Sequence, residues 1–441
     1  MIFLLDIILG LNLIWAYKSF KSIVSPPVLV GVGMFIASVI ATEYYKAWEL
    51  DKFCWESVIF LGVGTLFFTF SCLLFRKNVK QLNSDKIMSM SFNIGRLKIC
   101  LVFMIVLGLL AIYLKIKAYS SYYGNMSISE LIFANREDQM TDNYEFRMPI
   151  YIRFFARVIK IFLYCFSWVF SIAIFSPKKD KNFIILTIIY FIVSFIDGLF
   201  DGFKASAIER LMIVATIFVF VFQCKKKKLE MNKRMLLYSI IAFIIFVSSF
   251  EIMSVFIGRG ESTNRKGSSR ISEYIGAEIK NFDMYMYGRD GNQESNYFGG
   301  YSFAVIYRQL GIKTNATAKF QYVGINSLGN VYTQAFYFHK DFGDIGVFIM
   351  TFLVAMVSMF FYNKSLSYFQ KPNKQNTFLY LYSNMTMPLF MSFFASRFTE
   401  RIVNTQFLKD IGYVIVVIII FDKVFLIKNQ IQNELHIIKA Q

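Results

Sequence analysis

Long apolar runs separated by short polar segments dominate this chain of 441 residues. A helix needs about 20 mostly apolar residues to cross the hydrocarbon core of a bilayer. By that measure the pattern predicts eleven spans, at residues 2–16, 27–43, 54–75, 99–117, 152–177, 183–199, 205–223, 235–257, 343–362, 376–396 and 406–426. We therefore expect one all-α polytopic membrane domain over residues 1–441.

One long polar stretch, residues 258–342, interrupts this pattern and is rich in arginine and tyrosine. Within it, apolar residues recur at near-helical spacing over 271–287, which predicts an interfacial helix. A second helical run over 301–311 is stopped by Gly311 and is too short to cross a bilayer. In another polar segment, helix formers over Ser127–Arg136 predict a short helix.

Composition and charge distribution narrow the class of protein. With 56% hydrophobic and 17% charged residues, the chain cannot cover the surface of a soluble domain of this length. The net charge of +18 would suit a nucleic-acid binder, but lysine and arginine gather in alternate short loops, as in membrane proteins. We therefore expect a lipid bilayer, and no nucleic acid, as partner. These basic loops lie within 18–21, 76–98, 178–181, 225–234 and 364–374.

The positive-inside rule assigns the basic loops to the cytoplasm. This places the N-terminus outside, the C-terminus inside, and the following segments outside: 44–53, 119–150, 200–204, 258–342 and 397–405. Met1–Asp6 lacks a basic region and no small-residue cleavage site follows, so the first span is expected to be retained. The five cysteines lie in or beside spans and are expected to pack as small apolar residues.

Ionisable side chains at membrane depth are candidates for function. Arg153, Arg157 and Lys160 are spaced four and three residues apart, which puts three cations on one helical face. Such a stripe would face a wet cavity that binds an anion such as a diphosphate, or it would pair with external acids. Glu209 and Arg210, in a later span, can likewise pair with neighbours.

Arginine suits phosphate binding because its planar fork holds two oxygens and stays charged at any depth. Arg259 stands between two glycines at the start of the long polar stretch, and Arg308 follows within it. Tyrosines such as Tyr332 can stack on sugar rings, although aromatic belts at membrane interfaces have the same composition.

Two motifs resemble the late signature of the oligosaccharide repeat-unit polymerases, the Wzy-type O-antigen polymerases. They are Gly329-Asn330-Val331-Tyr332-Thr333 and Asp341-Phe342-Gly343-Asp344-Ile345-Gly346, the latter entering a span. Three further positions resemble that family: Gly202-Phe203-Lys204-Ala205-Ser206 is similar to its Gly-x-Arg-Ser turn, with Lys204 in place of arginine, and Arg259 and Arg397 match two of its arginines.

The resemblance implies a GT-C-like fold in a bacterial cytoplasmic (inner) membrane, with O-antigen or capsule-type polysaccharide as product. It implies transfer of a glycan from undecaprenyl diphosphate to another lipid-linked repeat unit, with a chain-length regulator as a further candidate partner. The expected diphosphate ligands are Arg136, Arg153, Arg157, Lys204, Arg259, Arg308 and Arg397, and the expected glycan ligands are Asn330 and Tyr332.

The acceptor hydroxyl needs a base, and His339 and Asp341 are available just before the ninth span. Each also has a structural interpretation: a packed histidine, and an aspartate that caps a helix. The first external loop lacks an Asp-x-Asp motif, so we expect no catalytic metal and no other cofactor.

Two alternatives remain open. The related O-antigen ligases have His-Asn-x-Tyr where this chain has Gly329 before Asn330, which favours a polymerase. A flippase for lipid-linked glycans is the second alternative, but transporters more often show two related halves.

Overall fold

The computed structural model describes residues 1–77, 90–140, 146–176, 179–226, 256, 270–368 and 376–427. Within these residues, eight helices are long and apolar enough to cross a membrane. They are α1 (Ile2–Phe20), α2 (Pro26–Glu43), a continuous helix of α3 (Trp55–Ser57), η2 (Val58–Val63) and α4 (Gly64–Leu74), α6 (Ile94–Tyr123), α8 (Ile150–Phe175), α9 (Lys181–Leu199), α10 (Lys204–Lys226) and α15 (Gln334–Tyr368). The predicted helical, multi-pass membrane architecture is confirmed.

The other three predicted spans differ from these eight. Residues 235–257 lie outside the described residues. Residues 376–396 form α16 (Thr377–Phe390) and the short 3-10 helix η3 (Met391–Phe393). At 14 residues, α16 is about 21 Å long, less than the roughly 30 Å of a hydrocarbon core. Residues 406–426 form α18 (Thr405–Phe425), whose two ends carry charged side chains.

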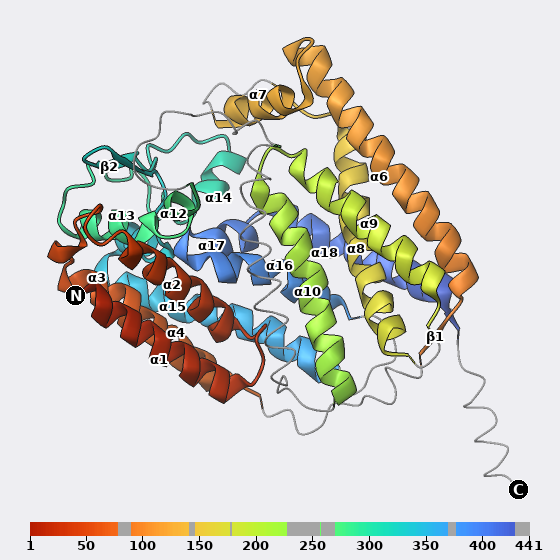
Figure 1. Ribbon diagram of the computed structural model, residues 1–441, viewed down its shortest axis with the longest axis horizontal. Helices are drawn as coiled ribbons and strands as arrows, with labels where there is room; N and C mark the ends of the chain where they lie inside the picture. The colour runs from red at the N-terminus through yellow and green to blue at the C-terminus, as the bar shows by residue number, and fades with distance from the viewer. Residues whose placement is uncertain are drawn as a thin grey trace, which may run out of the picture.

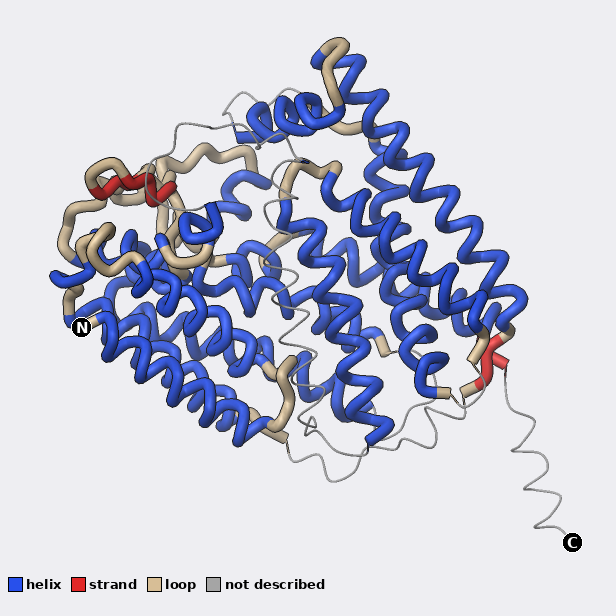
Figure 2. Tube along the Cα trace, in the orientation of Figure 1, coloured by secondary structure: helices blue, strands red, loops and turns tan. Residues whose placement is uncertain are grey.

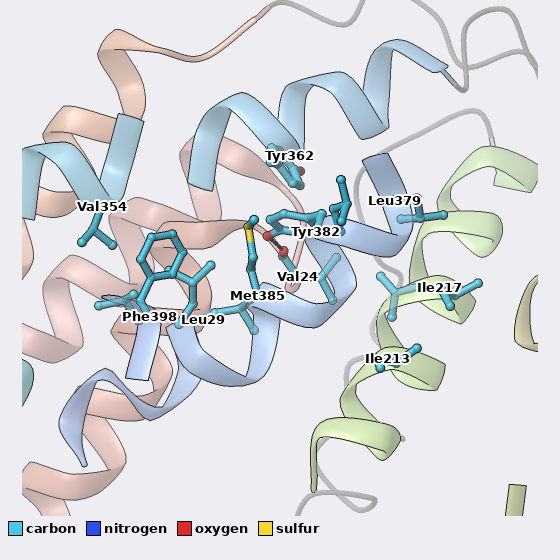
Figure 3. Packing of buried hydrophobic residues seen from close by; sticks show 14 of the residues in the cluster. Val24, Leu29, Ile213, Ile217, Val354, Tyr362, Leu379, Tyr382, Met385 and Phe398 are labelled. Carbon is cyan, nitrogen blue, oxygen red and sulfur yellow. Dashed lines mark hydrogen bonds between the residues drawn. The ribbon is translucent and has the colours of Figure 1, made fainter. Parts of the chain in front are cut away.

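The helices form two groups with α10 and α16 between them (Figure 1). One group contains α1, α2, α4 and α15, and the other contains α6, α8 and α9. Every residue of α16 from Leu379 to Leu389 is buried. In Figure 3, Leu379, Tyr382 and Met385 of α16 lie among buried residues of the neighbouring helices, and the Tyr382 hydroxyl donates to the carbonyl oxygen of Val24. The centre of the core is therefore a helix too short to cross a bilayer alone.

The segments predicted to lie outside meet at one end of the bundle, which we call the loop end. It comprises residues 44–53, 119–140, 200–203, 270–333 and 397–404. Asn326 Nδ2 donates to the Ala47 carbonyl oxygen (3.1 Å), and Gln309 Nε2 donates to Asn404 Oδ1 (2.9 Å). The loops of the structure therefore alternate between the two ends as the positive-inside pattern predicts.

Two predicted helices of the loop end are present. The first is α7 (Ile128–Met140), which follows a capping box formed by Ser127 and Glu130. The Ser127 hydroxyl and backbone N–H both donate to the Glu130 carboxylate at 2.8 Å. These bonds lower the pKa of Glu130. The second is α14 (Ala304–Gln309), which ends before Gly311 at a φ of 73°.

The prediction of one continuous helix over 271–287 is wrong. The segment forms α12 (Arg270–Tyr274) and α13 (Ala277–Met286), separated by Gly276 at a φ of 152°. Glycine adopts this conformation without the steric penalty of a side chain. The ideal Cβ position of Gly276 lies only 3.0 Å from Ile40 Cγ2, so α13 also packs closely against α2. The break allows α12 and α13 to form two separate helices, of which α13 packs against α2.

Two small strand pairs were not predicted, and Figure 2 shows both. β2 (Gln321–Val323) and β3 (Asn326–Gly329) form an antiparallel hairpin at the loop end. β1 (Ser91–Phe92) and β4 (Leu426–Ile427) pair antiparallel at the opposite end. Next to the second pair, the Asn93 N–H donates to the Phe425 carbonyl oxygen at 2.9 Å. This pairing joins the beginning of α6 to the end of α18.

A glycine divides α15 into two parts. Gly343 has φ 65° and ψ −166°, which is not helical. Residues 334–342 adjoin the loop end, and α15 packs against α4 and α16. The break lies at the first residue of the predicted span, within an apolar helix that extends over Gln334–Ser367.

Candidate functional site

The three cations predicted to form a stripe on α8 have different surroundings: two form ion pairs and one is exposed. Arg157 Nε lies 3.4 Å from Asp410 Oδ1 on α18. Lys160 Nζ lies 2.8 Å from Glu209 Oε1 on α10. Arg153, one turn nearer the loop end, is exposed. The alternative in which the stripe pairs with acids therefore describes Arg157 and Lys160, although the acids lie on neighbouring helices.

Arg401, which the sequence did not single out, joins these two ion pairs. It lies on α17 (Arg397–Ile402), and its Nη2 is 3.0 Å from Glu209 Oε1 and 3.4 Å from Asp410 Oδ2. The same atom donates to Asn384 Oδ1 at 3.0 Å. Burial alone would lower the pKa of the guanidinium, but Glu209 and Asp410 raise it above its ordinary value. Arg401 therefore stays charged.

Lys204 and Arg397, two of the predicted diphosphate ligands, are linked by an aromatic pair. Lys204 is buried, and its Nζ lies 5.0 Å from the ring centroid of Tyr274. The Tyr274 ring stacks on Phe394 with centroids 6.0 Å apart. The Arg397 guanidinium lies 5.4 Å from the Phe394 centroid and bonds Glu400 at 2.9 Å. Cation–π contacts of this kind hold both charges at the loop end.

The two arginines of α17 each keep one donor unsatisfied. Arg397 and Arg401 are four residues apart and therefore lie on the same side of the helix. The Nε atom of each is buried and has no hydrogen-bond partner among the described residues. A buried donor without an acceptor is costly, and more so on a charged group. Each guanidinium therefore lacks an acceptor at a buried position.

We call these charges the cationic cluster. Among the described residues it contains five cations, two of them on α17, and three carboxylates. The cations are Arg157, Lys160, Lys204, Arg397 and Arg401, and the carboxylates are Glu209, Glu400 and Asp410. The Arg397 and Glu400 side chains are 38% and 30% exposed, so the cluster reaches an accessible surface.

A second group of charges, which we call the sealed cluster, lies between α6, α9 and α10. Asp197 binds Lys115 Nζ at 2.8 Å and Arg210 Nη2 at 2.6 Å. Asp201 completes the set at 2.7 Å from Lys115. Its two cations and two carboxylates balance. Lys115 was missed in the sequence, although a lysine inside the predicted span 99–117 was the available signal.

Arg136 lies beside the turn that leads to Lys204. It is buried, and the ideal Cβ position of Gly202 is 3.2 Å from Arg136 Cβ. Burial lowers the pKa of Arg136, and the ion pair with Glu137 at 2.6 Å opposes that shift. Of the other predicted ligands, Arg308 is exposed on α14, and Arg259 lies outside the described residues.

The motif of Gly329 to Thr333 shapes the loop end. Tyr332 is fully buried, and its hydroxyl accepts hydrogen bonds from Asn292 Nδ2 (2.8 Å) and Gln321 Nε2 (2.9 Å). Asn281 Nδ2 donates to the Val331 carbonyl oxygen at 2.7 Å. Asn330, in contrast, is exposed. The Tyr332 hydroxyl is therefore occupied by contacts within the loop end. The Asn330 side chain remains accessible for the predicted contact with a glycan.

The two predicted bases face different surroundings. His339 Nδ1 lies 2.7 Å from the Tyr285 hydroxyl, and Nε2 lies 2.7 Å from Asp344 Oδ1. Asp341 accepts from the backbone N–H groups of Tyr301 (3.1 Å) and Ser302 (2.5 Å). In the described part of the chain, the polar contacts of His339 are to Tyr285 on α13 and to Asp344 beyond the Gly343 break, and none is to the cationic cluster. Asp341 therefore binds loop backbone ahead of α14, which is not the helix cap of its structural interpretation.

In the described part of the chain, no group of three or more His, Cys, Asp or Glu side chains is placed to hold a metal ion. The chain matches no protein-family model, no curated protein and no solved structure. Its function must therefore be inferred from its own residues and their geometry.

Proposed function

We propose that this protein is a repeat-unit polymerase, which transfers a glycan from undecaprenyl diphosphate onto a second lipid-linked repeat unit. The observation that carries the proposal is the pair of buried, unsatisfied Nε–H donors on Arg397 and Arg401. They belong to a cluster in which the described cations outnumber the described carboxylates. A lipid diphosphate linked to a sugar carries two negative charges, which such a cluster would attract.

The proposal includes the arrangement in the membrane. The eleven predicted crossings place the loop end on the outer face of a bacterial cytoplasmic membrane, with the N-terminus outside and the C-terminus in the cytoplasm. The GT-C-like organisation and the roles of Arg259 and Arg308 belong to this proposal as well. The alternation of loops between the two ends supports it.

The reaction mainly requires positive charge near the leaving diphosphate. When the acceptor hydroxyl attacks the anomeric carbon, the bond from that carbon to the phosphate oxygen breaks and charge builds on the diphosphate. Fixed cations in a site of low dielectric constant stabilise such charge without reorganising. Arg397 and Arg401 supply forked donors to phosphate oxygens, and Lys204 supplies a compact charge on the other side of the Tyr274–Phe394 pair.

The proposal is tested in detergent with purified protein and lipid-linked repeat units, where no compartments exist. We expect chain growth by the wild type and a loss of about 100- to 1000-fold in Arg397→Ala, the range for removing a donor to a developing charge. Arg289→Ala is the control, since Arg289 is an exposed arginine of the same loop end. Unchanged growth in Arg397→Ala would remove the proposed role of the cluster.

The same assay separates the alternatives. A polymerase produces a ladder of products that differ by one repeat unit. A ligase moves a finished glycan to a different acceptor and gives no ladder from repeat units alone. A flippase gives no covalent product in detergent and moves the lipid across vesicle membranes instead.

A further inference from the structure

The three carboxylates of the cationic cluster differ in how many cations each one binds and in how exposed each one is. Glu209 binds both Lys160 and Arg401, at 2.8 and 3.0 Å. Asp410 binds Arg157 and Arg401 and also accepts from Gln406 Nε2 at 2.9 Å.

Glu400 differs from both. It has one ion pair among the described residues, with Arg397 at 2.9 Å. Its side chain is 30% exposed, against 17% for Glu209 and 7% for Asp410. Glu400 is thus the carboxylate of the cluster that an incoming substrate can reach.

The other acid–base candidates are engaged elsewhere. Both ring nitrogens of His339 have partners, and those partners lie on α13 and beyond the Gly343 break. Both carboxylate oxygens of Asp341 accept backbone N–H groups. Among the described residues, neither group has a polar contact with the cationic cluster, where the leaving diphosphate is proposed to bind. A base must lie within hydrogen-bond reach of the proton that it accepts.

We infer that Glu400 is the general base of glycosyl transfer, an inference that rests on the proposed function and names a further catalytic residue for it. The acceptor hydroxyl oxygen bonds to the anomeric carbon of the donor, and its proton passes to the Glu400 carboxylate. The bond between that carbon and the diphosphate oxygen breaks, and undecaprenyl diphosphate leaves with the electron pair. The Glu400 carboxylic acid then loses its proton to water.

Charge balance supports this assignment. The donor carries two negative charges, and undecaprenyl diphosphate released from the sugar carries three when fully ionised. Protonation of Glu400 adds one positive charge to the cluster in the same step. Arg397, which the carboxylate held before the reaction, is then free to bind the leaving group more tightly. A base outside the cluster would not produce this match.

The test uses full-length protein in detergent and measures chain growth and binding of undecaprenyl diphosphate separately. We expect Glu400→Gln to lose growth by about 100- to 10,000-fold, the range for general-base catalysis, while it binds undecaprenyl diphosphate at least as tightly as the wild type. The matched control is Glu294→Gln, because Glu294 also pairs with one cation, Lys340 at 2.7 Å, but lies outside the cluster. It should retain growth and binding.

A small acid can replace a missing catalytic carboxylate. We therefore expect added formate to restore part of the growth of Glu400→Ala in a concentration-dependent manner, and to leave Arg397→Ala inactive. Normal growth in Glu400→Gln would overturn the assignment, and so would loss of lipid binding together with growth, or the lack of formate rescue in a variant that binds lipid. If the wild type itself neither binds the lipid nor extends chains, the proposed function is wrong, which is a different outcome.

Discussion

The two groups of buried charges in this protein differ in balance and in exposure. In the sealed cluster, Lys115 and Asp197 are 3% and 0% exposed, and cations equal carboxylates. In the cationic cluster, the ion-paired side chains of Arg157 and Arg401 keep 20% and 19% of their surface, and the described cations outnumber the described carboxylates. Buried charge alone therefore does not mark a binding site. A group of cations that outnumbers its described carboxylates and reaches an accessible surface is the better candidate.

The largest effect should come from Asp197→Asn, which tests whether the sealed cluster is structural. The substitution keeps the shape but leaves Lys115 and Arg210 without their shared carboxylate. Breaking a buried ion pair on one side costs about 3–5 kcal/mol. Thermal unfolding in detergent should show that loss. Asp201→Asn is the control, because Asp201 is 36% exposed and should cost no more than about 1 kcal/mol. Equal losses in the two variants would contradict the distinction.

The next effect tests whether the cationic cluster is open to an anion. Inorganic pyrophosphate should raise the thermal stability of the wild type, by about 2.7 kcal/mol at 100 times its dissociation constant. Arg397→Ala should lose most of this shift, whereas Asp201→Asn should keep it. A shift of the same size in Arg397→Ala would mean that pyrophosphate binds elsewhere.

A smaller effect concerns the turn that joins the two clusters. Gly202 lies between Asp201 and Lys204 at a φ of 80°. Alanine in the left-handed region costs about 1–2 kcal/mol. Gly311→Ala, at a φ of 73° with open space around its Cβ, should cost less than Gly202→Ala, because Gly202 also meets Arg136 at 3.2 Å. The free energies of unfolding of the two variants, measured under the same conditions, test this order. A larger loss of stability in Gly311→Ala than in Gly202→Ala would refute it.

The smallest effect should come from Phe394→Leu, which removes the ring between Arg397 and Tyr274. Loss of a cation–π contact costs about 0.5–1 kcal/mol. That corresponds to roughly a 2- to 5-fold weaker binding of undecaprenyl diphosphate. Binding titrations in detergent measure it. Phe394→Tyr, which keeps the aromatic face, should bind normally, and equal weakening in both variants would rule out the ring contact.

The sequence predicted much of the fold because span length and loop charge are local properties. Apolar runs located eight spans, and Ser127 and Glu130 predicted the beginning of α7. The break of the loop helix at Gly276 was missed because the apolar spacing continues across it. The β2–β3 hairpin was missed because its strands are too short to show an alternating pattern.

The site was only partly predictable. Lys204 and Arg397 were identified as cations at the loop end, but the aromatic pair that links them comes from α12 and η3–α17, which are far apart in the chain. Arg401 and Glu400 were overlooked since they lie in a short polar segment that looks like an ordinary loop. The direction of His339 depends on the break at Gly343, which spacing alone does not reveal.

The pairing of β1 with β4 has a consequence for the order of assembly during synthesis. Leu426 and Ile427 emerge from the ribosome long after Ser91 and Phe92, so the edge of β1 stays without its partner until almost the whole described chain has been made. Chains that stop before Leu426 would lack the pairing of β4 with β1. Its absence would distinguish incomplete chains from complete ones for cellular proteases.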